Sequence, residues 1–284
     1  MTMQLKDVLY TKNQGIATIT LNRPEVLNAF SKEMLEGWVA CIEDAKLDHN
    51  VKVVVVTGAG RGFCSGMDAK LAGKRFSEGS TDKREASLIQ SDDDENSLFI
   101  EQRHELKNTV HRIPRALATL DKPYVGIING PCAGAGMDMA SMCDIRIASD
   151  NAKFTMAYVK MGLVPGDGGC YFLPKILGIS KALDLIWTGR IFGSKEALDM
   201  GYVDMVFPHD HLVDQATDYL LQIASGPSVA IQVAKRLVYQ CWEADLNTAL
   251  DLCQYGQFIA RATEDSKEGP IAFVQKRKPE FKGR

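Results

Sequence analysis

Residues 123–149 read PYVGIINGPCAGAGMDMASMCDIRIAS, and this stretch carries the pattern that decides the fold. Its apolar beginning, Pro123–Asn129, is typical of a buried strand. The glycine-rich turn Gly130–Gly136 follows, and Met137–Cys143 has the composition of a short helix. Asp144–Ser149 then returns to a strand pattern. A strand, a glycine turn, a helix and a second strand therefore follow one another directly, as they do in α/β folds.

The N-terminal part of the chain shows the same alternation. Gly15–Leu21 (GIATITL) alternates apolar and polar residues, as a half-buried strand does. Ser31 is placed to cap a helix that runs to about Leu47. Val51–Thr57 (VKVVVVT) predicts a buried strand, which ends in the glycine-rich loop Gly58–Gly62. We therefore predict an α/β fold of repeated β-β-α units through about residue 150.

After Gly169 the sequence pattern becomes mostly helical. Ser194 opens a short helix that Gly201 ends. Three further helices are predicted over Pro227–Gln240, Leu246–Ala262 and Ser266–Lys276. We place a boundary near residue 205, with a spiral core over residues 1–205 and a helical region over residues 206–284. The segment from Leu71 to Arg112 fits neither part, and two interpretations stay open for it: a solvated loop, or a roof over a substrate pocket.

Composition argues against several classes of protein. The 284 residues are 45% apolar and 24% charged, with a formal net charge of -3, so a nucleic-acid partner is not expected. The longest apolar runs fall short of the roughly 20 residues of a membrane span, and Met1–Tyr10 lacks a signal-peptide pattern. Seven scattered cysteines without a C-x-x-C pair suggest reduced thiols in a cytoplasmic protein. His209 and His211 lack a third ligand nearby, so no metal site is predicted.

Two glycine turns, Gly62–Met67 and Gly130–Gly136, each follow an apolar strand. Glycine permits a close approach of the backbone to a ligand, and amides at such turns can be directed at one oxygen atom. One hypothesis is an oxyanion hole that stabilises an enolate; the other is two ordinary strand–helix turns. A dinucleotide site is disfavoured because Phe63 stands where G-x-G-x-x-G needs its last glycine.

Several motifs in order resemble the crotonase (enoyl-CoA hydratase/isomerase) family, and the resemblance covers nearly the whole chain. The matching segments are Asn22–Pro24, Asn28–Phe30, Arg61–Asp68, Asn129–Asp138, Cys143–Asp144, Phe154, Gly162–Pro165, Leu173–Pro174, Thr188–Arg190, Ala197–Val203, Phe273 and Lys276–Arg277. The resemblance implies a right-handed spiral of β-β-α units with a helical C-terminal region. It also implies a homotrimer or homohexamer that acts on an acyl-CoA thioester and needs no separate cofactor.

The resemblance also assigns binding residues. The oxyanion donors would be the backbone amides of Met67 and Ala135. The loop around Gly66, Asp68 and Lys70 resembles the adenine-binding segment of the family. Arg23 and Lys276 are candidates for the CoA phosphates, although Arg23 taken alone is more typical of a solvated surface charge.

The catalytic positions depart from the two-glutamate pattern of typical hydratases. Asp138 stands at the first glutamate position and Tyr158 at the second, while Asp167 lies in the turn Pro165–Gly169. Asp138 is either a general acid/base or an acid that stabilises a helix N-terminus. Tyr158 either donates a proton or only shapes the pocket, and Asp167 is either catalytic or ordinary turn chemistry.

The leading expectation is hydration of a 2-enoyl-CoA. Retro-Claisen ring opening of a β-oxoacyl-CoA and a double-bond shift are alternatives, since some crotonase-like hydrolases carry a similar V-P-G-D-G run. A family member that only binds acyl-CoA is a further alternative. His104 and His111 are within reach of the pocket, but surface or core packing is the simpler interpretation for both.

Overall fold

The computed structural model describes residues 2–67 and 106–284. Asp68, Lys70, His104 and most of the segment from Leu71 to Arg112 lie outside the described residues, so the predictions made for them stay predictions. No helix in the described part has the length and apolar character needed to cross a bilayer.

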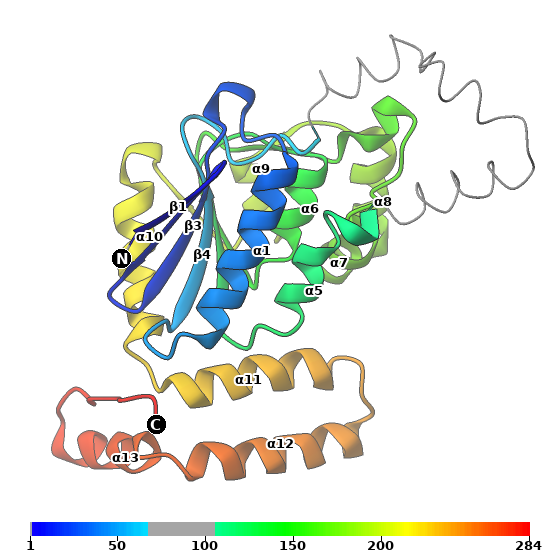
Figure 1. Cartoon of the computed structure of the whole chain (residues 1–284). Helices are drawn as coiled ribbons and strands as arrows, with labels where there is room; N and C mark the ends of the chain where they lie inside the picture. Colours follow the sequence, from blue (N-terminus) through cyan, green and yellow to red (C-terminus); the bar gives the residue numbers. More distant parts are fainter. Residues whose placement is uncertain (1, 68–105) are drawn as a thin grey trace, which may run out of the picture.

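A seven-stranded sheet forms the centre of the molecule, with the strand order β1-β2-β3-β4-β5-β7-β10 (Figure 1). Its strands are β1 (Thr2–Leu5), β2 (Val8–Asn13), β3 (Ile16–Leu21), β4 (Val53–Gly58), β5 (Tyr124–Ile128), β7 (Ile145–Ser149) and β10 (Met205–Phe207). The first three pair antiparallel, and all pairs from β3 to β10 are parallel. The predicted strands β3, β4, β5 and β7 are thus confirmed within two residues at either end.

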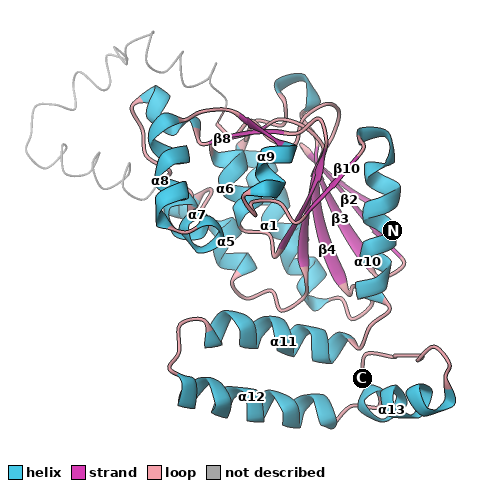
Figure 2. Ribbon diagram, turned by 180° about the vertical axis from the view of Figure 1, so that it is seen from behind, coloured by secondary structure: helices cyan, strands magenta, loops and turns pink. Residues whose placement is uncertain are grey.

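Helices cover both faces of this sheet. The larger core lies under α1 (Lys32–Leu47), α5 (Arg112–Leu117) and α6 (Ala135–Ser141). The opposite face is covered by α10 (Leu212–Ala224), which Figure 2 shows along the sheet. The predicted cap of α1 is confirmed: Ser31 lies at its N-cap and accepts a hydrogen bond from the Met34 amide at 3.0 Å. The α/β architecture with a helical C-terminal region is therefore as predicted.

A second, three-stranded sheet was not predicted. It consists of β6 (Cys132–Ala133), β8 (Lys153–Thr155) and β9 (Phe192–Gly193), and an isolated bridge joins Cys64 to Cys132 beside it. Strands of two or three residues are too short to show a period in the sequence. This small sheet holds the two glycine turns next to each other.

Short helices lie between and after the last two strands of the second sheet and complete the main body. They are η2 (Ala157–Met161), α7 (Gly169–Leu177), α8 (Ile179–Thr188), α9 (Ser194–Asp199) and η3 (His209–His211). The last three helices, α11 (Ser228–Cys241), α12 (Leu246–Arg261) and α13 (Asp265–Gln275), lie below the main body (Figures 1 and 2). A cavity of about 940 Å³ separates α11 from α5 and α7.

Neither hydrophobic core contains a residue of α11, α12 or α13. In contrast, β10 pairs with β7, and α10 packs on the sheet. The division at residue 205 stays a prediction, and the part that stands away from both cores begins at α11.

Candidate active site

The motif that opens the family resemblance braces the first glycine turn. Asn28 is fully buried and has a left-handed backbone, with φ of 56°. Its side-chain amide donates to the carbonyl oxygens of Ala59 at 3.0 Å, Gly62 at 2.8 Å and Phe63 at 3.1 Å. One side chain therefore fixes the path of the loop that follows β4. Sequence reasoning counted Asn28 as part of a motif but did not foresee this role.

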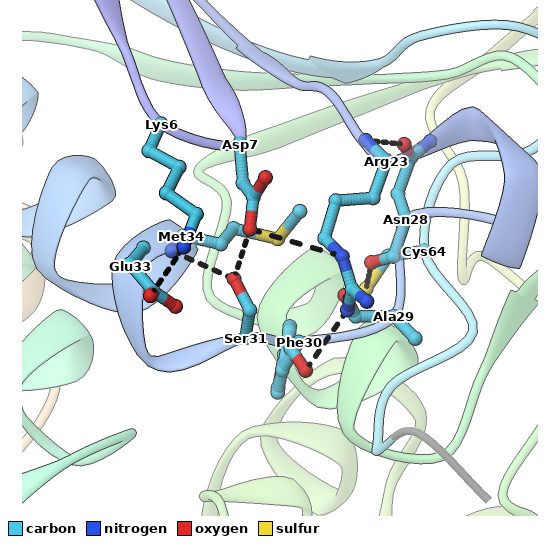
Figure 3. Close-up of polar contacts among 10 residues, drawn as sticks. All are labelled: Lys6, Asp7, Arg23, Asn28, Ala29, Phe30, Ser31, Glu33, Met34 and Cys64. Carbon is cyan, nitrogen blue, oxygen red and sulfur yellow. Dashed lines mark hydrogen bonds and ion pairs between the residues drawn. The ribbon is translucent and has the colours of Figure 1, made fainter. Parts of the chain in front are cut away.

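Arg23 lies in the same brace (Figure 3). Its Nη1 donates to the carbonyl oxygen of Ala29 at 2.8 Å and to that of Phe30 at 3.3 Å, and its Nε lies 3.8 Å from Asp7 Oδ2. The guanidinium thus holds the chain that leads into α1. These contacts stabilise the local fold, and the assignment of Arg23 to a CoA phosphate stays a prediction.

The two glycine turns pack against each other through their backbones. The amide of Ala133 donates to the carbonyl of Cys64 at 3.0 Å, and the amide of Phe30 donates to Gly66 at 2.8 Å. A Cβ on Gly66, whose φ is +80°, would lie 2.8 Å from the amide nitrogen of Ala135. A Cβ on Gly136 would lie 2.2 Å from the carbonyl oxygen of Cys64. Glycine is required at both positions because no side chain fits between the turns.

Two backbone amides at this junction have no acceptor within the described part of the chain. One belongs to Met67, directly after Gly66, and the other to Ala135, the first residue of α6. The first amides of a helix lack intrahelical acceptors and carry a partial positive charge. Because Gly66 packs on the Ala135 amide, the structure brings Ala135 close to the residue before Met67, and the role of the two amides as oxyanion donors stays a prediction.

Asp138, Tyr158 and Asp167 form one buried cluster. The hydroxyl of Tyr158 lies 2.7 Å from Asp138 Oδ2 and 3.0 Å from Asp167 Oδ2. The backbone amide of Asp167 donates to Asp138 Oδ2 at 3.3 Å. Asp138 is 0%, Tyr158 8% and Asp167 6% exposed. Asp167 is thus no surface turn residue, and the structure brings together the three residues selected from the sequence as catalytic candidates.

The two short oxygen–oxygen contacts limit how many protons the three side chains of this cluster carry. A phenol has one proton and can donate it to only one of two carboxylates. The second short oxygen–oxygen contact is favourable only when the other carboxyl is protonated and donates to the phenol oxygen, because two ionised carboxylates in a dry site repel each other. The cluster therefore holds at least one protonated carboxylic acid, and the other carboxyl accepts the hydrogen bond of the phenol.

Electrostatics agree with this count. Burial raises the pKa of Asp138 to about 7, and the neighbouring charge of Asp167 adds to the rise, while the hydrogen bond from Tyr158 opposes it. Burial also raises the pKa of Asp167, against the hydrogen bond from Tyr158 and the influence of His111. The phenol of Tyr158 has a pKa well above its ordinary value, because burial and both acids disfavour a phenolate. Tyr158 therefore stays a donor.

Each aspartate keeps one oxygen without a partner. Asp138 Oδ1 and Asp167 Oδ1 are buried, and neither has a well-aligned hydrogen bond among the described residues. The backbone amide of Gly169 is nevertheless close enough to Asp138 to lower its pKa. Buried carboxyl oxygens are rarely left unpaired, and where they are, a ligand or water is the usual partner. Gly169, at the start of α7, packs directly on Asp138, since a Cβ there would lie 2.2 Å from Oδ1. The start of α7 therefore covers Asp138 Oδ1, and Asp167 Oδ1 is the carboxyl oxygen of the cluster that lacks a partner among the described residues.

Other predicted residues lie elsewhere. Lys276 follows α13, which both overall views place well apart from α6, so one subunit alone does not bring Lys276 to the glycine turns. His111 Nε2 lies 2.8 Å from the carbonyl oxygen of Gly166, beside Asp167, which sequence reasoning treated as the less expected outcome. No group of three metal-ligating side chains occurs within residues 2–67 and 106–284.

Comparison with known proteins agrees with this geometry. The sequence model of the family described as Enoyl-CoA hydratase/isomerase matches residues 11–93 and 89–284. The chain is 32% identical to 1,2-epoxyphenylacetyl-CoA isomerase of Escherichia coli, covering 98% of both chains. It is 31% identical to short-chain-enoyl-CoA hydratase of Clostridium acetobutylicum, covering 99% of this chain and all of the relative.

A crystal structure of enoyl-CoA hydratase from Bacillus anthracis superimposes with a TM-score of 0.84 at 28% identity, over 98% of this chain and 100% of the other. Fold, motifs and sequence likeness thus point to the same group of proteins. The chain belongs to the enoyl-CoA hydratase/isomerase family, within the crotonase superfamily.

Proposed function

We propose that this acyl-CoA-processing enzyme shifts a carbon–carbon double bond next to the thioester by moving a proton. The observation that carries the proposal is the pairing of Asp138 and Asp167 through the single hydroxyl of Tyr158. A carboxylate and a carboxylic acid at one site supply both the base and the acid that such a shift needs. Burial raises the pKa of Asp138 to about 7, so this group titrates near neutral pH. General acid/base catalysis is most efficient when the pKa of the catalytic group lies near the working pH.

We propose the following steps. Asp138 takes a proton from the carbon next to the thioester carbonyl of a 3-enoyl-CoA. The electron pair moves into a dienolate, whose oxygen accepts hydrogen bonds from the amides of Met67 and Ala135. A carboxylic acid of the cluster then returns a proton to the distal carbon, which yields the 2-enoyl-CoA. The mass of the substrate does not change, and water takes no part.

Hydration of a 2-enoyl-CoA, the expectation from the sequence, is the second candidate. It needs a water molecule that both the acid and the base hold. The phenol oxygen of Tyr158 already lies between the two acids, within hydrogen-bond distance of both, where such a water would have to lie. What favours hydration is that Asp167 Oδ1 has no partner among the described residues and suits a water. Relatives are named for hydration as well as for isomerisation. A protein that only binds acyl-CoA would gain nothing from two buried acids.

We also propose how CoA and a second copy of the chain are bound. The adenine-binding segment would include Gly66, Asp68 and Lys70, with Arg23 and Lys276 near the phosphates. Because α13 lies well apart from α6 in one subunit, Lys276 would reach the CoA of a neighbouring subunit. A homotrimer or homohexamer, held through residues 206–284, supplies that arrangement.

Mass spectrometry on a panel of 2-enoyl-, 3-enoyl- and β-oxoacyl-CoA thioesters in heavy water tests the proposal. A double-bond shift leaves the heavy-atom mass unchanged and introduces deuterium into recovered 2-enoyl-CoA. Gain of one water on 2-enoyl-CoA would establish hydration instead, and gain of water with ring opening would establish hydrolysis. Binding by calorimetry without turnover on any thioester would overturn all three reactions.

A further inference from the structure

We propose that His111 is a positioning residue that holds the peptide between Gly166 and Asp167 in the orientation that serves Asp138. The inference rests on the proposed role of Asp138 in proton transfer. It goes beyond that role because it assigns a function to a side chain outside the acid cluster, on a different element of the fold.

One peptide unit connects His111 to Asp138. Its carbonyl, from Gly166, lies 2.8 Å from His111 Nε2, and its amide, from Asp167, donates to Asp138 Oδ2 at 3.3 Å. A carbonyl oxygen only accepts hydrogen bonds, so Nε2 carries the proton and donates. Hydrogen bonds on the two ends of one peptide polarise each other in the same direction. The imidazole therefore strengthens the amide that stabilises the Asp138 carboxylate.

The peptide needs such a clamp. Gly166 precedes it and Gly168 follows Asp167 with φ of +117°, so the turn has glycine freedom on both sides. Rotation of this peptide would turn the Asp167 amide away from Asp138. The same rotation would move the Asp167 side chain, whose Oδ2 contacts Tyr158 at 3.0 Å. The rotation changes ψ of Gly166 and φ of Asp167, and the glycine on the first side of the peptide tolerates such a change easily.

His111 is well placed to act as a fixed support. It is the N-cap of α5, its amide donates to the Leu106 carbonyl at 2.9 Å, and its carbonyl accepts from Arg115 at 3.3 Å. The next residues of α5 anchor the helix in the core, with Ile113 0% and Ala116 6% exposed. A donor on a rigid helix can hold a flexible turn, whereas a donor on the turn could not.

Three variants test the assignment: His111→Leu, which removes the donor, His111→Gln, which keeps one, and Arg115→Gln as control. Arg115 lies on the same helix and donates from Nη1 to the Lys107 carbonyl rather than to a residue of the turn. We expect His111→Leu to lower kcat about 10- to 100-fold, the order of loss for a misplaced catalytic group, with little change in KM. His111→Gln should restore most of kcat, and the control should match the wild type.

Hydrogen exchange supplies a readout that does not depend on turnover. The amide of Asp167 should exchange faster in His111→Leu than in the wild type and regain protection in His111→Gln. Should the leucine variant fail to fold, His111→Asn, which is polar but too short to reach Gly166, replaces it with the same expected results. Unchanged kcat and unchanged exchange in the variants without a donor would overturn the inference. Full activity of Asp138→Asn would instead overturn the proposed function, while the exchange result would still decide the role of His111.

Discussion

Asp138 is held between two competing influences, since burial favours its neutral form and hydrogen bonds favour its charged form. The balance leaves its pKa near 7, far from the value of an exposed aspartate. An acid used only to stabilise the start of a helix needs no such environment, because a surface position serves that purpose. The sequence left two roles open for Asp138, a general acid/base or an acid that stabilises a helix N-terminus. The two roles predict different effects when Asp138 is replaced.

Asp138→Asn keeps the size of the side chain and removes its ability to exchange a proton. We expect kcat to fall roughly 10²- to 10⁴-fold, the usual contribution of a general acid/base, with the fold retained. Steady-state kinetics and a melting curve by circular dichroism check this. Near-normal kcat with a lowered melting temperature would show that Asp138 serves only the helix.

Tyr158→Phe removes the hydroxyl whose hydrogen bond lowers the pKa of Asp138. Activity that needs an ionised carboxylate rises with pH through the pKa of that group, near 7 for Asp138. Loss of the hydrogen bond raises this pKa, so the acidic limb of the kcat profile should move to higher pH. Above the limb, the loss in kcat should match about one hydrogen bond, ~0.5–1.5 kcal/mol, and be smaller than that of Asp167→Asn.

Tyr239→Phe is the matched control for the pH profile. Its hydroxyl donates to Asp144 Oδ1 at 2.8 Å, so it is a phenol–carboxylate pair outside the acid cluster. Its profile should coincide with that of the wild type. If the pH profile of Tyr158→Phe also coincides with that of the wild type, Tyr158 does not affect the pKa of the group that titrates in the profile.

The sequence alone was sufficient to identify most residues of the candidate site, but not the contacts between them. Asp138, Tyr158 and Asp167 occupy motif positions, so each could be named from its neighbours along the chain. Their mutual hydrogen bonds could not, because 20 residues of chain separate Asp138 from Tyr158 and only the packing of α6, η2 and α7 sets the distances. The contact of His111 with Gly166 spans 55 residues and has no sequence signal of its own.

At the scale of elements, the two glycine turns decide where the site lies. Gly66 and Gly136 allow the loop after β4 to contact the start of α6 with no side chain between them. These turns were predicted because each follows a long apolar strand. The strands β6, β8 and β9 that support them were missed because tertiary pairing, rather than local pattern, makes them strands.

Gly136→Ala should therefore disturb both turns at once. The new Cβ would lie 2.2 Å from the Cys64 carbonyl oxygen, so the backbone has to shift. Overpacking of this kind costs typically ~1–3 kcal/mol, and we expect a loss of that order in the free energy of unfolding, together with a large loss of kcat. Urea unfolding and kinetics measure the two effects.

Gly193→Ala is the control for this substitution. Gly193 has an extended backbone, with φ of -94°, and a Cβ there would meet nothing within 4 Å. Both its stability and its kcat should stay within experimental scatter of the wild type. Equal effects of the two substitutions would mean that Gly136 has no special role in the close approach of the turns.

On the scale of the whole molecule, α11, α12 and α13 lack a core of their own. Neither hydrophobic core includes them, and large apolar side chains on them stay in contact with water in one subunit. The most exposed are Tyr255 at 69%, Leu246 at 72%, Phe273 at 85% and Val274 at 80%. Many large apolar side chains exposed on one group of helices suggest a surface that another protein covers. A second copy of the chain is the simplest cover, and it agrees with the expected trimer or hexamer.

Replacing Phe273 with aspartate tests whether this surface joins subunits. A charge buried at a subunit contact is unfavourable unless it is paired, so Phe273→Asp should shift the protein toward monomers of 31.3 kDa in analytical ultracentrifugation. Val213→Asp is the matched control, because Val213 is 68% exposed on α10, outside α11–α13. It should sediment like the wild type. Because Lys276 follows α13 directly, dissociation should also raise KM for an acyl-CoA more than it lowers kcat. A wild-type protein that sediments as a monomer at every concentration would show that α11–α13 join no subunits, and Lys276 would then have no route to the CoA.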